Sequence, residues 1–238
     1  MFKFFKNIRK SLVMKNNTSK YIKYAIGEIV LVVIGILIAL WINNLNEKRK
    51  DNNKEEAILE ELNKDFKDNL NQFLTIKKLH IQSLKSTVEF KKYINHPTPF
   101  LVKDSIAKYY FKAFNGATFN PSNGVIESLI SSGEYKLIKN DTLRKYIISW
   151  KDVIRSYSYN ESFTSRLWSE KIEPYLISEG DLTNLSNPIN LNLVLGQKFK
   201  NLTERHLLYM NNLVNHIKEG DIEKYLEGIV NLSEQRHD

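Results

Sequence analysis

Cysteine is absent from the 238 residues of this chain. Its absence excludes disulfide bonds and thiolate metal sites, and it removes several classes of enzyme from consideration. Glycine and proline are also scarce, at 9 and 5 residues, and no stretch alternates apolar and polar residues over several strands. Few helix breakers and no strand pattern predict an all-α fold.

Recognisable motifs for catalysis or metal binding are lacking as well. There is no glycine-rich phosphate loop and no GxSxG turn, and the S-x-x-K pattern at Ser105 to Lys108 lacks the companion KTG and SDN elements of penicillin-binding enzymes. The histidines share no metal-ligand spacing; they are His80, His96, His206, His216 and His237. We therefore predict no catalytic residue, no metal and no cofactor, in a protein that is not an enzyme.

Acidic side chains are missing from residues 1–23, which carry seven lysines and arginines. The whole chain has 35 basic and 27 acidic residues, with a formal charge of +8. Removing the seven N-terminal basic residues leaves 28 basic against 27 acidic residues. Because the rest of the chain is nearly neutral, it offers no basic surface for a phosphate backbone, and we expect no nucleic-acid partner.

What the sequence does contain is one long hydrophobic run, YIKYAIGEIVLVVIGILIALWI, at residues 21–42. After Lys23, the one charged side chain in this run is Glu28. A helix rises about 1.5 Å per residue, so the run is long enough to span a hydrocarbon core of about 30 Å. Tyr21 and Trp41 stand near its ends, as interfacial aromatic residues do. The run predicts a transmembrane helix surrounded by the lipid bilayer.

The charges that flank this run predict its orientation. The tail of residues 1–20 is purely basic, whereas acidic and basic residues mix after the run, so the N-terminus is expected in the cytoplasm and the C-terminal part outside it. The run is long for a signal peptide, and LWINNLNEKRK lacks a small-x-small cleavage pattern, which favours an uncleaved signal anchor. Residues 1–15 form either an amphipathic helix in the inner headgroup layer or a disordered basic tail.

Residues 43–95 are expected to form a helical stalk and the first helix of a bundle. Residues 43–56 are highly polar and suit either a continuous stalk or a loosened linker. Apolar residues then recur every three or four positions from Leu59 to Val88, which predicts a buried helical stripe. The prolines of HPTP, at residues 96–99, end this helix.

Residues 96–238 are predicted to complete the helical bundle. Asp104 is the expected N-cap of a short helix, and Gly133 is the expected C-cap of the next one. Asp141 opens a longer helix with an apolar face, and Pro174 ends or bends it.

The last part of the chain is predicted to contain a connection and two more helices. Residues 178–196 are rich in Gly, Asn, Ser and Pro and are expected to be extended, with a short strand at INLNLVL as an option. One helix then runs from near Gln197 to Glu219, and Asp221 caps a terminal segment.

One face of the membrane helix combines a carboxylate with small residues. Steps of four, three and four place four residues on this face: Glu28, Val32, Gly35 and Ala39. The face is a candidate packing surface for a second copy of the chain or for another membrane protein. The alternative is a protonated Glu28 near the inner interface, reaching toward Lys20 or Lys23.

An aromatic cluster beside an Asn- and Gly-containing loop is the candidate surface for a partner or ligand. Its members are Tyr109, Tyr110, Asn115, Phe119 and Asn120. Helical spacing places Ile106, Tyr110 and Phe114 on one face, however, so ordinary core packing is the favoured explanation for the rings.

The N-terminal sequences FFKNIRKSL and KYIKYAIGEIVLVVIGILIALWINNLNE, with the later SLISSGEYKLIKNDTLR, resemble a group of uncharacterised single-span membrane proteins from Bacteroidetes. The resemblance implies a bacterial inner-membrane protein with Gly27, Glu28 and Gly35 in the shared motif. Trp41 stands where a glutamine is more usual in the group. The resemblance implies no activity.

Together these features predict an anchored periplasmic helical protein that acts by interaction, as an accessory or scaffold subunit of a membrane complex. A cytoplasmic tail of about 20 residues is too short for a kinase or cyclase domain. The alternative is a periplasmic sensor module that binds a small molecule, of a class that the sequence does not indicate, and signals through its membrane helix.

Overall fold

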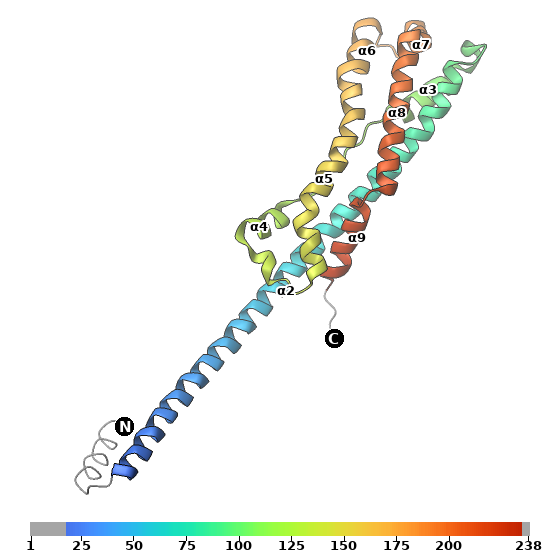
Figure 1. Cartoon of the computed structure of the whole chain (residues 1–238). Helices are drawn as coiled ribbons and strands as arrows, with labels where there is room; N and C mark the ends of the chain where they lie inside the picture. The colour runs from blue at the N-terminus through green and yellow to red at the C-terminus, as the bar shows by residue number, and fades with distance from the viewer. Residues whose placement is uncertain (1–17, 235–238) are drawn as a thin grey trace. The chain divides into compact units, whose positions relative to one another are not determined.

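The computed structural model of the chain describes residues 18–234 (Figure 1). All regular structure in this range is helical, which confirms the all-α prediction. The helices are α2 (Thr18–Ile94), α3 (Lys103–Ala113), α4 (Gly124–Ser132), α5 (Asp141–Leu167), α6 (Glu173–Glu179), α7 (Pro188–Leu195), α8 (Gln197–Glu219) and α9 (Ile222–Ser233). Two 3-10 turns are η1 (Pro99–Val102) and η2 (Glu134–Leu137), and a π-helical segment, η3 (Trp168–Ile172), joins α5 to α6.

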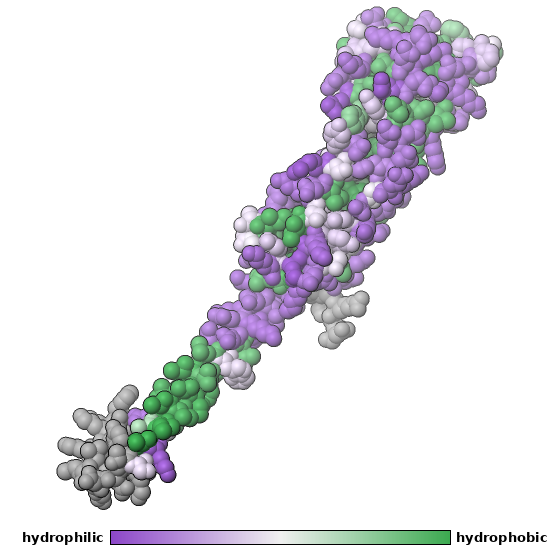
Figure 2. Space-filling view, in the orientation of Figure 1, coloured by the Kyte–Doolittle hydropathy of each residue, from purple (hydrophilic) through white to green (hydrophobic). Residues whose placement is uncertain are grey.

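The chain divides into two compact units, Met1–Glu55 and Glu56–Asp238. The described part of the first unit is helical, and it contains a helix long and apolar enough to cross a membrane. An 18-residue window there has a mean hydropathy of 2.7, with 0% of it buried, and Figure 2 shows this stretch as a contiguous hydrophobic surface. Water solvates such a surface poorly, so the helix is a candidate membrane anchor. The predicted tail, residues 1–20, lies almost wholly outside the described residues.

The second unit is built on the C-terminal part of α2, whose inward positions recur in strict steps of four and three. These positions are Leu62, Phe66, Asn69, Phe73, Ile76, His80, Ser83, Thr87, Phe90 and Ile94. Each is buried or partly buried, as expected of one helix face. Val88, which the predicted stripe included, is 48% exposed. The prediction was wrong there, because it followed apolar residues instead of the spacing.

Two hydrophobic cores pack along this face. The first joins α2 to α4, α5, α9 and the end of α8, with Trp150 against Phe66 at a ring distance of 5.0 Å in an edge-on contact. The second joins α2 to α3, η3, α7 and the start of α8 around Phe90 and Phe199. Edge-on ring pairs of this kind add stability beyond the area they bury.

Most of the expected helix signals are found in the structure. Gly133 ends α4 with a left-handed φ of 77°, and α5 begins at Asp141 as predicted. Its N-cap is Asn140, which was not predicted and whose side chain accepts a hydrogen bond from Leu143 N. Residues 43–56, for which a stalk and a linker were both open, are helical throughout. Gly220 follows the last residue of α8.

Two local expectations were wrong. Asp104 is not an N-cap, because α3 begins at Lys103 and Asp104 lies inside its first turn, where a carboxylate favours the helix dipole. The helix from Asp141 agrees with the prediction, since the π-helical segment η3 continues α5 to Ile172 and Pro174 lies in the first turn of α6, which begins at Glu173.

The second error concerns residues 178–196, where INLNLVL is helical and forms most of α7. The Asn187 side chain accepts a hydrogen bond from Ile189 N, and Pro188 occupies the first turn. An Asn followed by Pro is a helix start signal as well as a loop signal, and the prediction treated it as a loop signal alone.

Candidate functional site

Three buried polar side chains meet inside the first core, between α2 and α5. The Tyr157 hydroxyl donates a hydrogen bond to Glu161 Oε1 at 2.9 Å, and His80 Nε2 lies 3.0 Å from the same oxygen. His80 Nε2 also lies 3.2 Å from the Tyr157 hydroxyl. The residues are 4%, 0% and 5% exposed for His80, Tyr157 and Glu161. Glu161 follows Tyr157 by four residues, so both side chains lie on one face of α5.

Burial raises the pKa of the Tyr157 hydroxyl above its ordinary value, and the neighbouring Glu161 carboxylate raises this pKa further. The hydroxyl therefore keeps its proton at physiological pH. It acts as a hydrogen-bond donor to the carboxylate, which stays buried with partners on several sides.

The same carboxylate holds the loop between α3 and α4, residues 114–123. The backbone N–H of Phe119 donates to Glu161 Oε1 at 3.1 Å and to Oε2 at 3.2 Å. The Phe119 ring packs edge-on against Phe73 and Tyr157. A charged acceptor for a buried backbone N–H makes a strong hydrogen bond, so the loop is held from inside the core.

Two further side chains fasten the end of this loop. Asn69 Nδ2 donates to the carbonyl of Ser122 at 2.9 Å, and Ser122 N donates to Asn69 Oδ1 at 2.8 Å. Trp150 Nε1 donates to Asn123 Oδ1 at 2.7 Å. Polar groups that a loop would otherwise present to water are thus satisfied by α2 and α5.

The start of the loop is held by the carbonyl of Ala113, the last residue of α3. This carbonyl accepts a hydrogen bond from Ser83 Oγ and one from His206 Nε2, the latter at 3.0 Å. Burial lowers the pKa of His206 to about 4. The imidazole is neutral at pH 7, and its proton sits on Nε2, because a carbonyl can only accept.

Together these side chains form a buried polar centre that holds the loop of residues 114–123 against the helices. Its members are Asn69, His80, Ser83, Tyr157, Glu161 and His206. Among the described residues that are not exposed, every buried side-chain nitrogen and oxygen has a hydrogen-bond partner. A histidine, tyrosine and glutamate set can carry protons in enzymes, but here its hydrogen bonds end on the backbone of the chain's own loop. The arrangement secures residues 114–123 between the two cores.

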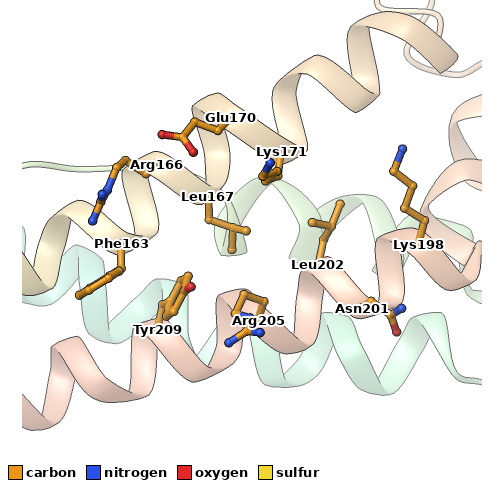
Figure 3. A pocket seen from close by; sticks show the side chains of 10 residues that line it. All are labelled: Phe163, Arg166, Leu167, Glu170, Lys171, Lys198, Asn201, Leu202, Arg205 and Tyr209. Atoms are coloured by element: carbon orange, nitrogen blue, oxygen red, sulfur yellow. The ribbon is translucent and has the colours of Figure 1, made fainter.

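An open groove lies on the surface where α5 and η3 face α8 (Figure 3). Its volume is about 870 Å³. Four cationic side chains line it, with Glu170 as the one carboxylate among its lining residues. The cations are Arg166, Lys171, Lys198 and Arg205. The apolar side chains Leu167 and Leu202 come from opposite walls, and Phe163 contacts Tyr209 at a ring distance of 5.4 Å.

A second hollow, of about 420 Å³, lies between α5 and the end of α8. Ser156 Oγ and His216 Nε2 face each other there at 3.4 Å. The nearby Asp152 carboxylate lies 3.4 Å from Arg155 on its own helix. The serine–histidine distance is long, and the Asp152 carboxylate faces Arg155 instead of the histidine. The three side chains are therefore not arranged as a nucleophile, its base and an orienting acid.

The residues of the predicted partner or ligand surface do not gather at one place. Phe119 is 2% exposed in the first core, whereas Tyr110 packs on Phe90 and Phe199 in the second core. Burial raises the pKa of Tyr110 to about 12. Tyr109 stacks on Tyr93 at 5.5 Å, and Asn115 and Asn120 are exposed. Core packing accounts for Tyr110 and Phe119, and a binding role for the exposed members stays a prediction.

The predicted packing face of the candidate membrane helix is largely exposed in the single chain. Val32 is 55% exposed, Ala39 is exposed and Glu28 is partly buried. A side chain added at Gly35 would meet no atom within 4 Å. The face is therefore open to a second helix, and its use remains a prediction.

Metal-ligating side chains do not cluster in the described range, where no group of three or more histidine, aspartate or glutamate residues is placed to hold an ion. The polar centre itself was missed by the sequence reasoning, which considered His80 and His206 only as metal ligands. The signal was present in the steps of four and three along α2, which place Asn69, His80 and Ser83 at buried positions.

Comparison with known proteins gives a family and no closer relative. No curated protein and no solved structure matches the chain significantly. Residues 28–202, which include the polar centre's Asn69, His80 and Glu161, match a family described only as being of unknown function. This match covers well over half of the chain, from within the apolar helix into α8. The chain thus belongs to the DUF6090 family of unknown function.

Proposed function

We propose that this protein is an anchored accessory subunit of a bacterial inner-membrane complex, acting by interaction and not by catalysis. The observation that carries the proposal is the uncovered apolar surface of α2. From Ile22 to Leu45 its large apolar residues are about half or more exposed, as in Leu31 at 67% and Val33 at 47%. A lipid bilayer, or a neighbouring helix within it, covers such a surface.

The proposed topology places residues 1–20 in the cytoplasm and the helical domain in the periplasm. The seven basic residues before residue 24 support this orientation. Fusion of alkaline phosphatase or a fluorescent protein to the C-terminus tests it, since the phosphatase is active outside the cytoplasm and the fluorescent protein inside it. An active phosphatase and a dark fluorescent fusion are expected. The reverse pair overturns the topology.

The proposed contact within the membrane is the face of Glu28, Val32, Gly35 and Ala39, which takes a second copy of the chain or another membrane subunit. Crosslinking in native membranes, followed by purification, tests this with Gly35→Ile and Glu28→Leu. Loss of associated proteins or a smaller oligomer is expected. Gly27→Ile is the matched control, because Gly27 also has open space around it but lies off the face. Unchanged partners and oligomer size in both test variants overturn the contact.

The second candidate function is a ligand-binding sensor, and the groove between α5 and α8 is the observation that favours it. A groove of about 870 Å³ has the size of many small-molecule sites. A ligand that binds the folded domain raises its unfolding temperature. Thermal unfolding of the full chain in detergent against a broad metabolite panel distinguishes the two functions, since a pure scaffold shows no stabilisation.

A further inference from the structure

We propose that the groove between α5–η3 and α8 is a binding site for a multivalent anion, a molecule or headgroup carrying two or more phosphate or carboxylate groups. The inference deepens the sensor alternative and does not depend on the membrane-complex role. It rests on the charge, the pairing and the support of the side chains that line the groove.

The first argument is that the groove's cations have no carboxylate partner. In the part of the chain that the structure describes, Arg166, Lys171, Lys198 and Arg205 form no ion pair. The Arg166 side chain donates its hydrogen bonds to the carbonyl and hydroxyl oxygens of Ser162, and neither is a carboxylate. Four unneutralised cations around one hollow create a local positive potential that favours an anion.

The second argument comes from the carboxylates beside the groove. Glu204 precedes Arg205 in α8, yet its Oε1 lies 2.7 Å from Lys91 Nζ on α2. Lys77 pairs with Glu223 in the same way between α2 and α9. Acidic residues thus neutralise lysines between helices elsewhere in a nearly neutral domain, and Glu170 is left as the one carboxylate lining the groove.

The third argument is that aromatic rings lie close to three of the four cations, in cation–π geometry. The Arg166 guanidinium lies 5.2 Å from the Phe163 ring centre, and the Arg205 guanidinium lies 5.7 Å from the Tyr209 ring centre. Lys198 Nζ lies 3.9 Å from the Tyr175 ring centre. A guanidinium beside a ring can still direct N–H groups outward, and such groups match phosphate and carboxylate oxygens. Arg166 donates from Nε and Nη2 to Ser162, which leaves its remaining N–H groups for a ligand.

The fourth argument is the backbone that forms one wall. Lys171 and Glu170 belong to η3, a π-helical turn of five residues, Trp168–Ile172. A π-helical turn is less stable than a regular one and is frequent at functional sites. Here the turn places two of its side chains, Glu170 and Lys171, in the groove. Ile172 of the same turn is buried in the second core.

The test uses the full chain in nanodiscs of zwitterionic phosphatidylcholine, titrated with pyrophosphate and with citrate by calorimetry. The groove variant is Lys171→Gln with Lys198→Gln, and the matched control is Lys145→Gln with Lys151→Gln, two exposed lysines of α5 outside the groove. Binding is expected to weaken roughly 10-fold in the groove variant, as loss of charged contacts implies, and by less than about 2-fold in the control. Circular dichroism verifies that both variants fold.

A second arm separates a soluble anion from a lipid headgroup. The nanodisc-held protein is floated with cardiolipin vesicles, whose headgroup carries two phosphates, and capture that the groove variant loses identifies the headgroup as the source. Binding of pyrophosphate or citrate alone identifies a soluble ligand. Failure of both probes and of vesicle capture overturns the proposal, and so does an equal loss in the groove and control variants. Neither outcome affects the proposed membrane topology.

Discussion

The backbone N–H of Phe119 donates to both carboxylate oxygens of Glu161, at 3.1 and 3.2 Å. The two residues are 42 positions apart, and both are buried. The contact joins α5 to the loop after α3, and through His80 the same carboxylate reaches α2. One carboxylate therefore ties together three parts of the helical domain.

Replacement of Glu161 by alanine is expected to be strongly destabilising. It leaves the Phe119 N–H, the Tyr157 hydroxyl and His80 without their common partner inside the core. Stranding buried donors costs about 3 kcal/mol or more of the free energy of unfolding. Chemical denaturation of the full chain in detergent, followed by circular dichroism, measures the change. Glu170→Ala, at an exposed position, is the control, and equal stability of the two variants contradicts this role.

Much of the fold follows from local sequence signals. The helices α2 and α5 were predictable, because long runs free of glycine and proline carry apolar residues at helical spacing. The end of α4 was predictable because Gly133 takes a left-handed φ of 77° that other residues avoid. These signals act over a few residues and need no tertiary contact.

The polar centre was not predicted, because its partners are distant in sequence. His80 and Glu161 are 81 positions apart, and their pairing depends on how α2 and α5 pack. The spacing on α2 held part of the answer, since Phe66, Phe73, His80 and Thr87 follow one another in steps of seven. Following apolar residues alone shifted the predicted stripe to Val88 and concealed the polar residues that face inward.

Replacement of Asn69 by leucine is expected to loosen the loop of residues 114–123. The leucine cannot pair with the N–H and carbonyl of Ser122, so both groups lose their partner. Hydrogen exchange measured by mass spectrometry is expected to accelerate in the loop, with a loss of about 1–3 kcal/mol in the free energy of unfolding. Asn71→Leu, on the exposed side of α2, is the control. Unchanged exchange in the Asn69 variant excludes a fastening role.

Replacement of Gly228 by alanine tests the contact of α9 with α5. A β-carbon at this position would collide with the ring of Tyr146, which itself packs on Tyr225 at a ring distance of 4.5 Å. Overpacking of this kind costs about 1–3 kcal/mol, to be measured by thermal unfolding. Combining Gly228→Ala with Tyr146→Ala is expected to cost less than the sum of the two single changes. Additive losses would show that the ring is not the obstacle.

The protonation of His206 links the stability of the domain to pH. Burial holds the pKa of this histidine at about 4 in the folded protein, below the ordinary value of 6.5. Protons therefore bind the unfolded chain first. The contribution of neutral His206 to stability is complete above about pH 6.5 and is lost progressively as the pH falls toward 4. The pKa of Asp181, lowered to about 2 by hydrogen bonds from Thr183 and Asn187, shifts stability only below this window.

The variant His206→Gln is expected to flatten this pH dependence. Glutamine retains an N–H that can donate to the Ala113 carbonyl, but it does not titrate. Between pH 7 and pH 4 the wild-type chain should lose about 3 kcal/mol more of its free energy of unfolding than the variant does, as a pKa depressed by this amount implies. Denaturation at half-unit pH steps measures both curves. Parallel curves would mean that His206 protonates as readily in the folded protein as in the unfolded chain.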